Sequence, residues 1–333
     1  MREPLLSVRG LCTYFLNNKK IVRAVDGVSF DVNKGEIFGL VGESGCGKSA
    51  TCRSLIRLVQ STGEIVDGEI LYNGEDLVRL PEKKMAEIRG REIGMIFQEP
   101  MNTLNPLTTI GTQLMEVYQR QKLSKAEMTE KAVEMMRLVG IPDPAARLKD
   151  YPHQFSGGMR QRAMIAIALA AQPKLLLADE PTTALDVTIQ DQIIRLLLEL
   201  REKLSMSMIL VTHDMGVASR MCDRIAVMYA GRIMEITTSH ELFYNPRHPY
   251  TLGLMRSMPL AGKGVRLEPI QGTPPDLSQE IAGCPFAPRC KMAREECRSQ
   301  TPALREAEPG HLSACHRAED LTGESFLTCK EVQ

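Results

Sequence analysis

The segment from Gly42 to Ser49 constrains this chain most strongly. It reads Gly-Glu-Ser-Gly-Cys-Gly-Lys-Ser and fits the pattern G-x-x-x-x-G-K-[ST] at every fixed position. Glycines let the backbone wrap closely around a phosphate, while successive N–H groups and the start of a following helix supply positive potential. Residues 37–41 before the motif form an apolar run typical of a buried strand, and residues 50–59 after it have a helical pattern. The sequence therefore predicts a nucleotide-binding loop between a strand and a helix.

Each position of this loop has an expected part in holding the nucleotide. Lys48 is expected to reach the β- and γ-phosphates of ATP, and the Ser49 hydroxyl is expected to ligate Mg²⁺. The other residues expected to surround the phosphates are Gly42, Glu43, Ser44, Gly45, Cys46, Gly47 and Ala50. Cys46 lies beside Lys48 and before a helix N-terminus, and both features predict a lowered pKa for its thiol. We therefore expect ATP to protect Cys46 from alkylation.

A pair of acidic residues predicts the second half of the nucleotide site. Residues 175–178 form a short apolar run that ends in Asp179 and Glu180. A carboxylate at the end of such a strand can lie beside Mg²⁺, and the next carboxylate can act on the attacking water. Taken alone, the pair is more typical of a solvated strand end. Together with the phosphate loop it predicts hydrolysis of a nucleoside triphosphate, with Asp179 on Mg²⁺ and Glu180 acting on water.

The remaining pattern predicts an α/β protein with a parallel sheet. Residues 174–178, 208–211 and 224–228 are apolar runs separated by helix-like stretches, the alternation expected of parallel strands joined by helices. The first part is strand-rich, and Asn73-Gly74 between apolar pieces predicts a tight hairpin. Residues 115–139 have apolar positions at helical spacing and end before Gly140.

Composition excludes several classes of protein. The chain has 333 residues, enough for two domains, and its 41 basic and 41 acidic residues give no net charge. That balance argues against a protein that binds nucleic acid through bulk charge. No apolar run approaches the roughly 18 residues of a membrane-spanning helix, and no signal-peptide core follows Met1. We therefore expect a chain that is neither secreted nor itself membrane-spanning.

The stretch from Tyr151 to Arg162 resembles the signature sequence of ATP-binding-cassette (ABC) ATPases. It contains Ser156-Gly157-Gly158 and lies a short helix upstream of the Asp-Glu strand, as in that family. Other family motifs follow in the same order over about residues 5–235. Gln98 resembles the glutamine of the Q-loop, residues 183–186 resemble the D-loop that ends in Asp186, and His213 resembles the switch histidine.

The resemblance implies a role for each of these residues. Gln98 is implied to contact Mg²⁺ and to act with Glu180 and His213 in hydrolysis. Ser156, Gly157 and Gly158 are implied to present a helix N-terminus to the γ-phosphate held by a partner subunit, and Asp186 is implied to line the same nucleotide. Phe15 lies where the family places an aromatic residue on adenine, with Tyr14 as the second candidate. Each has a simpler alternative: Phe15 as a core residue and Ser156 as an ordinary helix N-cap.

The family resemblance also implies the fold and the domain organisation. We expect a P-loop ABC ATPase domain over residues 1–240, with a RecA-like α/β core, an antiparallel β subdomain and a helical subdomain at about residues 99–165. Prolines punctuate the chain after about Ser239, where helical and strand periodicity fade. We therefore expect residues 241–333 to form a small, irregular, metal-bound C-terminal domain.

The tail narrows the resemblance to one branch of the family. Residues 243–251 and the cysteine-rich end resemble the ATPases of oligopeptide and dipeptide importers. That branch implies a heterodimer with a second ABC ATPase subunit, two transmembrane permease subunits and an extracytoplasmic solute-binding protein, with no nucleic acid. It places the chain peripherally on the cytoplasmic face of the cell membrane. The alternatives are import of nickel, glutathione or another small solute, a soluble ABC ATPase outside transport, and a metal-sensing regulator.

Four cysteines of the tail form a candidate metal site. Cys284, Cys290, Cys297 and Cys315 are separated by five, six and seventeen residues, so they lack the close C-x₂₋₄-C pairs usual in zinc knuckles. Four thiolates on an irregular loop suit a [4Fe–4S] cluster, with zinc and unliganded thiols as the alternatives. Members of the resembled branch carry an iron–sulfur cluster at a similar cysteine set. The nearby cations expected to offset the thiolate charge are Arg289, Lys291, Arg294 and Arg298.

Overall fold

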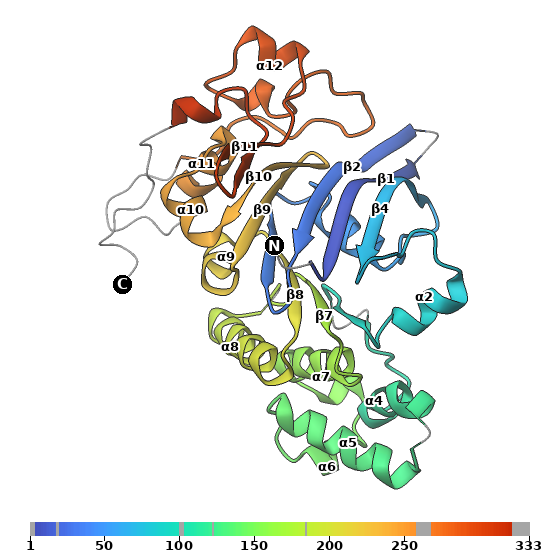
Figure 1. Ribbon diagram of the computed structural model, residues 1–333. Coiled ribbons are helices and arrows are strands. Elements are labelled where there is room, and N and C mark those ends of the chain that lie inside the picture. The colour runs from blue at the N-terminus through green and yellow to red at the C-terminus, as the bar shows by residue number, and fades with distance from the viewer. Residues whose placement is uncertain are drawn as a thin grey trace. The chain divides into compact units, whose positions relative to one another are not determined.

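The computed structural model describes residues 4–17, 20–99, 103–121, 123–183, 185–257 and 268–321. The chain divides into two compact units. Residues 1–79 and 210–333 form the first, here called the terminal unit, and residues 80–209 form the second, the middle unit. Figure 1 labels elements of both units where there is room.

The terminal unit contains an antiparallel sheet with the strand order β2-β1-β4-β5 (Figure 1). Its strands are β1 (Leu6–Asn17), β2 (Lys20–Val32), β4 (Gly63–Tyr72) and β5 (Glu75–Asp76). The predicted hairpin is confirmed, because Asn73 and Gly74 both adopt positive φ, 48° and 82°, between β4 and β5. Asparagine and glycine tolerate that conformation best, so the turn residues determine where the strand reverses.

The terminal unit also contains strands in the order β11-β12-β10-β9-β3. The buried strand β3 (Ile37–Val41) has the predicted bounds and pairs in parallel with β9 (Arg224–Tyr229). Antiparallel pairing then joins β9 to β10 (Arg232–Thr238), β10 to β12 (His311–Ser313), and β12 to β11 (Arg305–Glu308). The helices of this unit are α1 (Lys48–Leu55), α9 (Met215–Met221), α10 (Ser239–Tyr244), α11 (Pro249–Arg256) and α12 (Glu295–Ser299), with short 3₁₀ turns η3 (Ala287–Arg289) and η4 (Ala318–Leu321).

A buried carboxylate ties the C-terminal segment to this sheet. Glu235 of β10 is 0 % exposed and accepts hydrogen bonds from the Arg247 backbone N–H at 2.6 Å, from the Thr251 hydroxyl and from His311 Nε2 at 2.6 Å. These donors come from the start of α11, from the segment before it and from β12. The proline-rich tail therefore has an ordered anchor made of polar contacts, which apolar periodicity could not predict.

The middle unit contains a small group of parallel strands and a set of helices (Figure 1). Its strand order is β8-β7-β6, where β6 (Ile93–Ile96) pairs in parallel with β7 (Leu175–Asp179) and β8 (Ser207–Thr212) leads the chain back to the terminal unit. The helices are α2 (Glu82–Ile88), α4 (Ile110–Tyr118), α5 (Lys125–Leu138), α6 (Pro144–Arg147), α7 (Gly157–Leu169) and α8 (Val187–Leu204), with 3₁₀ turns η1 (Gln119–Gln121) and η2 (Pro152–Gln154).

The single helix predicted over residues 115–139 is wrong in its continuity. The structure has α4, then η1, and starts a new helix, α5, at Lys125. Ser124 caps α5, because its hydroxyl accepts from the Glu127 N–H while the Glu127 carboxylate accepts from the Ser124 N–H. This capping box sets a helix start inside the apolar period. The predicted end is correct, since Gly140 follows with φ 75°.

None of the helices in the described parts of the chain is long and apolar enough to cross a membrane.

Candidate nucleotide-binding site and cysteine site

The phosphate loop in the terminal unit is closed around its lysine. Lys48 is the first residue of α1, is 4 % exposed, and donates from Nζ to the carbonyl oxygens of Gly42 and Glu43, both at 2.8 Å. Ser44 and Gly45 are exposed, whereas Ser49 and Ala50 are half-buried. The lysine therefore holds the loop in a ring and lies where a phosphate can take over its hydrogen bonds.

Two glycines of the loop are required by their surroundings. Gly47, the N-cap of α1, has φ 106°, and an added Cβ would lie 2.1 Å from the Ala24 carbonyl oxygen. Gly42 has φ 153°, and its Cβ would lie 2.1 Å from the Met228 carbonyl oxygen. Since Gly47 has no side chain to cap α1, the first N–H groups of that helix can receive phosphate oxygens.

The expectation of a lowered thiol pKa at Cys46 is wrong. Cys46 is only 5 % exposed, and burial raises the pKa of its thiol even though Lys48 nearby acts in the opposite direction. Removing the thiolate from water costs more free energy than the lysine charge returns. The thiol is therefore neutral at physiological pH and is not activated by the loop.

The acidic pair of the middle unit lies at the end of β7. Asp179 is 0 % exposed, and Glu180 follows it with φ 48°, a left-handed conformation that is uncommon for a residue with a Cβ. Glu180 Oε2 accepts hydrogen bonds from Gln98 Nε2 at 3.1 Å and from the Thr183 hydroxyl at 2.8 Å. The structure therefore brings Gln98 and Glu180 together and adds Thr183, which sequence reasoning missed.

The signature and D-loop residues are helix caps in the middle unit. The Ser156 hydroxyl accepts from the Met159 N–H at 3.3 Å at the start of α7, and Asp186 accepts from the Ile189 N–H at 2.9 Å at the start of α8. The N-cap alternative for Ser156 is thus correct, and Gly157 and Gly158 form the first turn of α7. Ala184 of the D-loop lies outside the described residues. Both helix starts offer N–H groups to an anion, as the resemblance implies.

His213 and Phe15 belong to the terminal unit. His213 is exposed and follows β8, directly before Asp214, which caps α9. Phe15 in β1 is half-buried, and its ring lies against the backbone of Gly63, where a Cβ would approach it to 2.4 Å. The Tyr14 hydroxyl instead donates to Asp26 at 3.0 Å, and burial with this carboxylate raises its pKa to about 12. Tyr14 is therefore engaged within β1–β2, and Phe15 remains the better candidate for an adenine contact.

The four cysteines of the tail lie close together in the terminal unit. Burial raises the pKa values of Cys284, Cys290 and Cys315, in the case of Cys315 to about 12, and the charges of neighbouring thiols raise all three further. The Cys284 N–H donates to the Cys297 carbonyl at 2.8 Å, so a backbone hydrogen bond directly joins two of the four cysteines. The residues the sequence grouped by spacing are therefore also grouped in space.

The surroundings of these thiols differ from the prediction. Arg317 is the cation whose charge lowers the pKa of Cys290, and its backbone N–H donates to Cys315 Sγ at 3.3 Å. Arg289 turns instead toward Glu43, and Arg294 pairs with Asp320. Across the ranges that the structure describes, no three His, Cys, Asp or Glu side chains are grouped so that they could hold a metal ion. The metal-bound part of the predicted fold is therefore not supported by a single-ion geometry.

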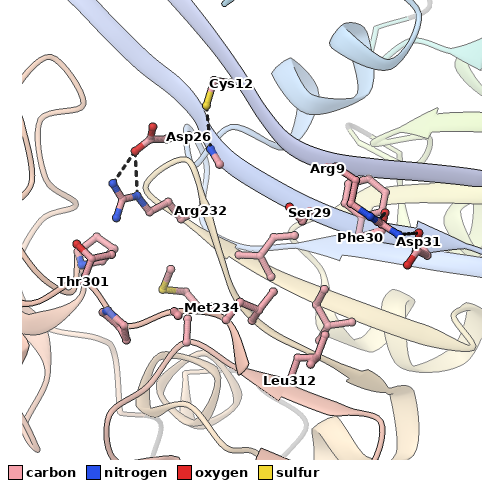
Figure 2. A pocket seen from close by; sticks show the side chains of 18 of the residues that line it. Arg9, Cys12, Asp26, Ser29, Phe30, Asp31, Arg232, Met234, Thr301 and Leu312 are labelled. Carbon is pink, nitrogen blue, oxygen red and sulfur yellow. Dashed lines mark hydrogen bonds and ion pairs between the residues drawn. The ribbon is translucent and has the colours of Figure 1, made fainter. Parts of the chain in front are cut away.

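A cavity of about 580 Å³ lies in the terminal unit between β1–β2 and β10–β12 (Figure 2). Sequence reasoning gave no sign of it. Its charged lining is paired: Arg232 donates to Asp26 at 2.7 and 2.9 Å, and Arg9 pairs with Asp31 at 2.6 Å. Figure 2 also labels apolar side chains of the wall, such as Met234 and Leu312, and the polar residues Ser29 and Thr301. The cavity therefore has a mixed lining whose labelled charges are paired with one another.

Comparison with known proteins identifies the family. Residues 25–183 match the ABC transporter family, and residues 234–297 match the oligopeptide/dipeptide transporter C-terminal region. The chain is 51 % identical over 316 residues to the dipeptide transport ATP-binding protein DppD of Bacillus subtilis, covering 94 % of each chain. It is 47 % identical to the oligopeptide transport ATP-binding protein OppD of Escherichia coli, covering 95 % of this chain and 94 % of that protein.

The chain belongs to the ABC transporter family. A solved dimeric ATP-binding cassette in a post-hydrolysis state with ADP and Pi superposes with a TM-score of 0.64 at 27 % identity, over 70 % of this chain and 98 % of the cassette. The P-loop ABC ATPase fold predicted from the sequence is therefore confirmed. This ABC transporter chain is an ATPase, with its phosphate loop in the terminal unit and its Asp-Glu pair in the middle unit.

Proposed function

We propose that this chain is the ATP-hydrolysing subunit of an importer for dipeptides or oligopeptides. The observation that carries the proposal is the match of both parts of the chain. The cassette and the C-terminal region are together about half identical to peptide transport ATP-binding proteins over nearly their whole length. Residues 234–297 also match a region named for that transporter class. The similarity to peptide transporters therefore includes the C-terminal region, outside the part of the chain that matches the ABC transporter family.

The residues of the site divide the work of hydrolysis. Lys48 and the loop N–H groups hold the β- and γ-phosphates, and Glu180 orients and polarises the attacking water. Gln98 and Thr183 both donate to Glu180 Oε2, so they fix the orientation of the carboxylate that acts on the water. His213 positions the attacking water against the γ-phosphate, and Phe15 stacks on adenine. Ser49, Asp179 and Gln98 are the residues proposed to hold Mg²⁺, which would supply positive charge to the phosphates.

The signature residues serve the nucleotide of a partner subunit. Ser156 and Asp186, which cap the starts of α7 and α8, are both exposed. Two cassettes closing head-to-tail would place the N–H groups of Gly157 and Gly158 on the partner's γ-phosphate. We propose a heterodimer with a second ABC ATPase, seated under two permease subunits and supplied by an extracytoplasmic solute-binding protein. This assembly places the chain peripherally on the cytoplasmic face of the membrane.

The four cysteines are proposed to hold a [4Fe–4S] cluster. The support is their grouping, the donor set and the basic neighbour Arg317. Zinc binds thiolates at about 2.3 Å around one centre, which needs sulfurs in near contact. A cluster places its own atoms between the sulfurs and suits a more open group. Anaerobic purification with iron, sulfide and zinc analysis tests this: about four irons with matching sulfide support the cluster, whereas one zinc per chain replaces it.

Reconstitution tests the transport function. The chain would be co-expressed with its permease and solute-binding partners, and ATP hydrolysis in vesicles would be measured with and without peptide. We expect peptide-loaded binding protein to stimulate hydrolysis. Stimulation by nickel or glutathione instead would keep the machinery and change the solute. Hydrolysis that neither partners nor solutes alter would favour a soluble ABC ATPase outside transport.

A further inference from the structure

We propose that Arg289 is a positioning residue for the phosphate loop, and that the segment of residues 284–290 couples the cysteine site to ATP binding through it. This segment begins at Cys284 and ends at Cys290, so two of the four cysteines bound it. Everything in the argument lies within the terminal unit. The inference rests on the proposed ATP site at the phosphate loop, but it does not depend on which metal the cysteines take.

All five N–H groups of Arg289 donate hydrogen bonds within the protein. Nη1 and Nη2 donate to the two carboxylate oxygens of Glu43 at 2.7 and 3.0 Å, which makes a bidentate pair with the second residue of the phosphate loop. Nη1 also donates to the Tyr229 hydroxyl at 3.2 Å. Nε and Nη2 donate to the carbonyls of Gln271 and Ile270 at 3.0 and 3.4 Å. The guanidinium is therefore fully satisfied and fixed.

The pair is largely removed from water. The Arg289 side chain is 6 % exposed and the Glu43 side chain 25 % exposed. The guanidinium lies 5.7 Å from the centre of the Tyr229 ring and 6.0 Å from that of Phe286. Low exposure and two parallel hydrogen bonds distinguish this contact from an exposed surface ion pair, which contributes little.

Glu43 is held from three sides. Its N–H donates to the Tyr250 hydroxyl at 3.0 Å, its carbonyl accepts from Lys48, and its carboxylate accepts from Arg289. The next two residues of the loop, Ser44 and Gly45, are exposed. A loop rich in glycine loses much conformational freedom when it closes on a phosphate, so fixing one residue beforehand improves ATP affinity.

A second anchor lies in the same segment. Phe286 packs edge-on against Tyr229, with ring centres 5.5 Å apart, and against Tyr250 at 5.2 Å. Tyr250 is the residue that holds the Glu43 N–H, and it is 0 % exposed. Residues 284–290 therefore reach the phosphate loop twice, once through Arg289 and once through Phe286 and Tyr250. These contacts connect the two flanking cysteines to the phosphate loop.

The test measures ATP affinity and turnover separately in the full chain. Arg289→Gln keeps an unbranched polar side chain, although a shorter one, and removes the charge and the fork. We expect the Kd for a fluorescent ATP analogue to rise about tenfold, equivalent to about 1.4 kcal/mol, with kcat within twofold of wild type. Arg9→Gln is the matched control, because it breaks the Arg9–Asp31 pair of the same unit and should leave both values unchanged. An Arg289→Gln Kd within twofold of wild type would overturn the proposal.

Two further variants separate positioning from general stability. Glu43→Gln alone should raise Kd about as much as Arg289→Gln, and the double variant should be no worse than either single one. Arg289→Lys, which keeps the charge but not the fork, should recover only part of the affinity and serves if Arg289→Gln does not fold. Additive losses in the double variant would contradict the direct contact.

A double-mutant cycle tests the coupling between the cysteines and ATP binding. Cys290→Ser should raise the Kd for ATP in the wild-type background and have no further effect in the Arg289→Gln background. An equal effect in both backgrounds would show that the cysteine acts by another route. Wild-type chain that neither binds nor hydrolyses ATP would refute the proposed function itself, a result distinct from all of these.

Discussion

The phosphate loop and the cysteine site are built in opposite ways. The residues that form the loop ring, from Gly42 to Lys48, are consecutive, and the hydrogen bonds of Lys48 that close the ring run inside that stretch, with added support for Glu43 from Tyr250 and Arg289. The cysteine site takes thiols from residues 284–315 and depends on contacts with β10, α11 and the phosphate loop. The geometry of a motif made of consecutive residues is determined largely by those residues, whereas the geometry of a site made of distant residues depends on the surrounding fold.

This difference separates the expected effects of mutation. Changes at the nucleotide site should reduce chemistry while leaving the fold intact. Changes around the tail should reduce stability first, and should affect chemistry only where Arg289 connects the two regions. The predictions below test that separation.

Glu180→Gln is expected to have the largest effect. Glutamine keeps an oxygen that accepts from Gln98 and Thr183 but cannot take a proton, so kcat should fall by about 10²- to 10⁴-fold with ATP affinity retained. Phosphate release measures the rate, and circular dichroism checks the fold. Glu199→Gln on the exposed face of α8 is the control and should behave as wild type. A Glu180→Gln chain that keeps half its activity would remove Glu180 from the mechanism.

Glu235→Ala is expected to affect stability strongly and the isolated chemistry little. The substitution leaves the buried donors of Arg247, Thr251 and His311 without their acceptor, so the free energy of unfolding should fall by about 3–5 kcal/mol. Urea denaturation measures it, with Glu319→Ala at an exposed position as the control. A loss under about 1 kcal/mol would show that this carboxylate does not anchor the tail.

The titration of His248 should make the free energy of unfolding depend on pH through the tail and not through the phosphate loop. Burial lowers the pKa of His248 to about 3, so the folded state keeps the ring neutral while the unfolded chain takes up a proton below its ordinary pKa near 6.5. Stability from this group is present above pH 6.5 and is lost as the pH falls toward 3. Between pH 7 and pH 5 the loss should be about 2 kcal/mol.

The comparison for His248 is His248→Asn, which keeps a side-chain acceptor for the Tyr250 N–H at the start of α11. Its unfolding free energy should fall less than that of wild type between the two pH values, because other titrating groups are common to both chains. Parallel curves for the two proteins would mean that His248 is not held neutral.

The same contrast explains what the sequence could predict. Strand β3, the loop after it and the helix start at Lys48 follow from consecutive residues and were predicted correctly. The break between α4 and α5 was missed because Ser124 and Glu127 cap each other inside an apolar period, so a local polar pair overrode the pattern. The grouping of the cysteines followed from their crowding in the sequence.

Contacts between distant residues could not be read in advance. Arg317 near the thiols, Arg289 on Glu43, and Thr183 beside Glu180 all depend on how segments meet in space. Gln98 and Glu180 are 82 positions apart, and only the resemblance to a family gave Gln98 a role beside Glu180. The predicted direction of the Cys46 pKa shift is wrong for a related reason, because the sequence shows the charged neighbour of this thiol but not its burial.

Cys46 gives the smallest expected effect and tests this last point. Since its thiol is buried and its pKa is raised, iodoacetamide at neutral pH should modify Cys46 at least about tenfold more slowly than the half-buried Cys12. ATP should change the Cys46 rate less than twofold, because the closed loop already excludes the reagent. Mass spectrometry of the two peptides over time gives both rates, with Cys46→Ser confirming that ATP affinity does not need the thiol. Strong protection by ATP would instead mean that the loop opens in solution, and that its geometry is less self-contained than its local hydrogen bonds indicate.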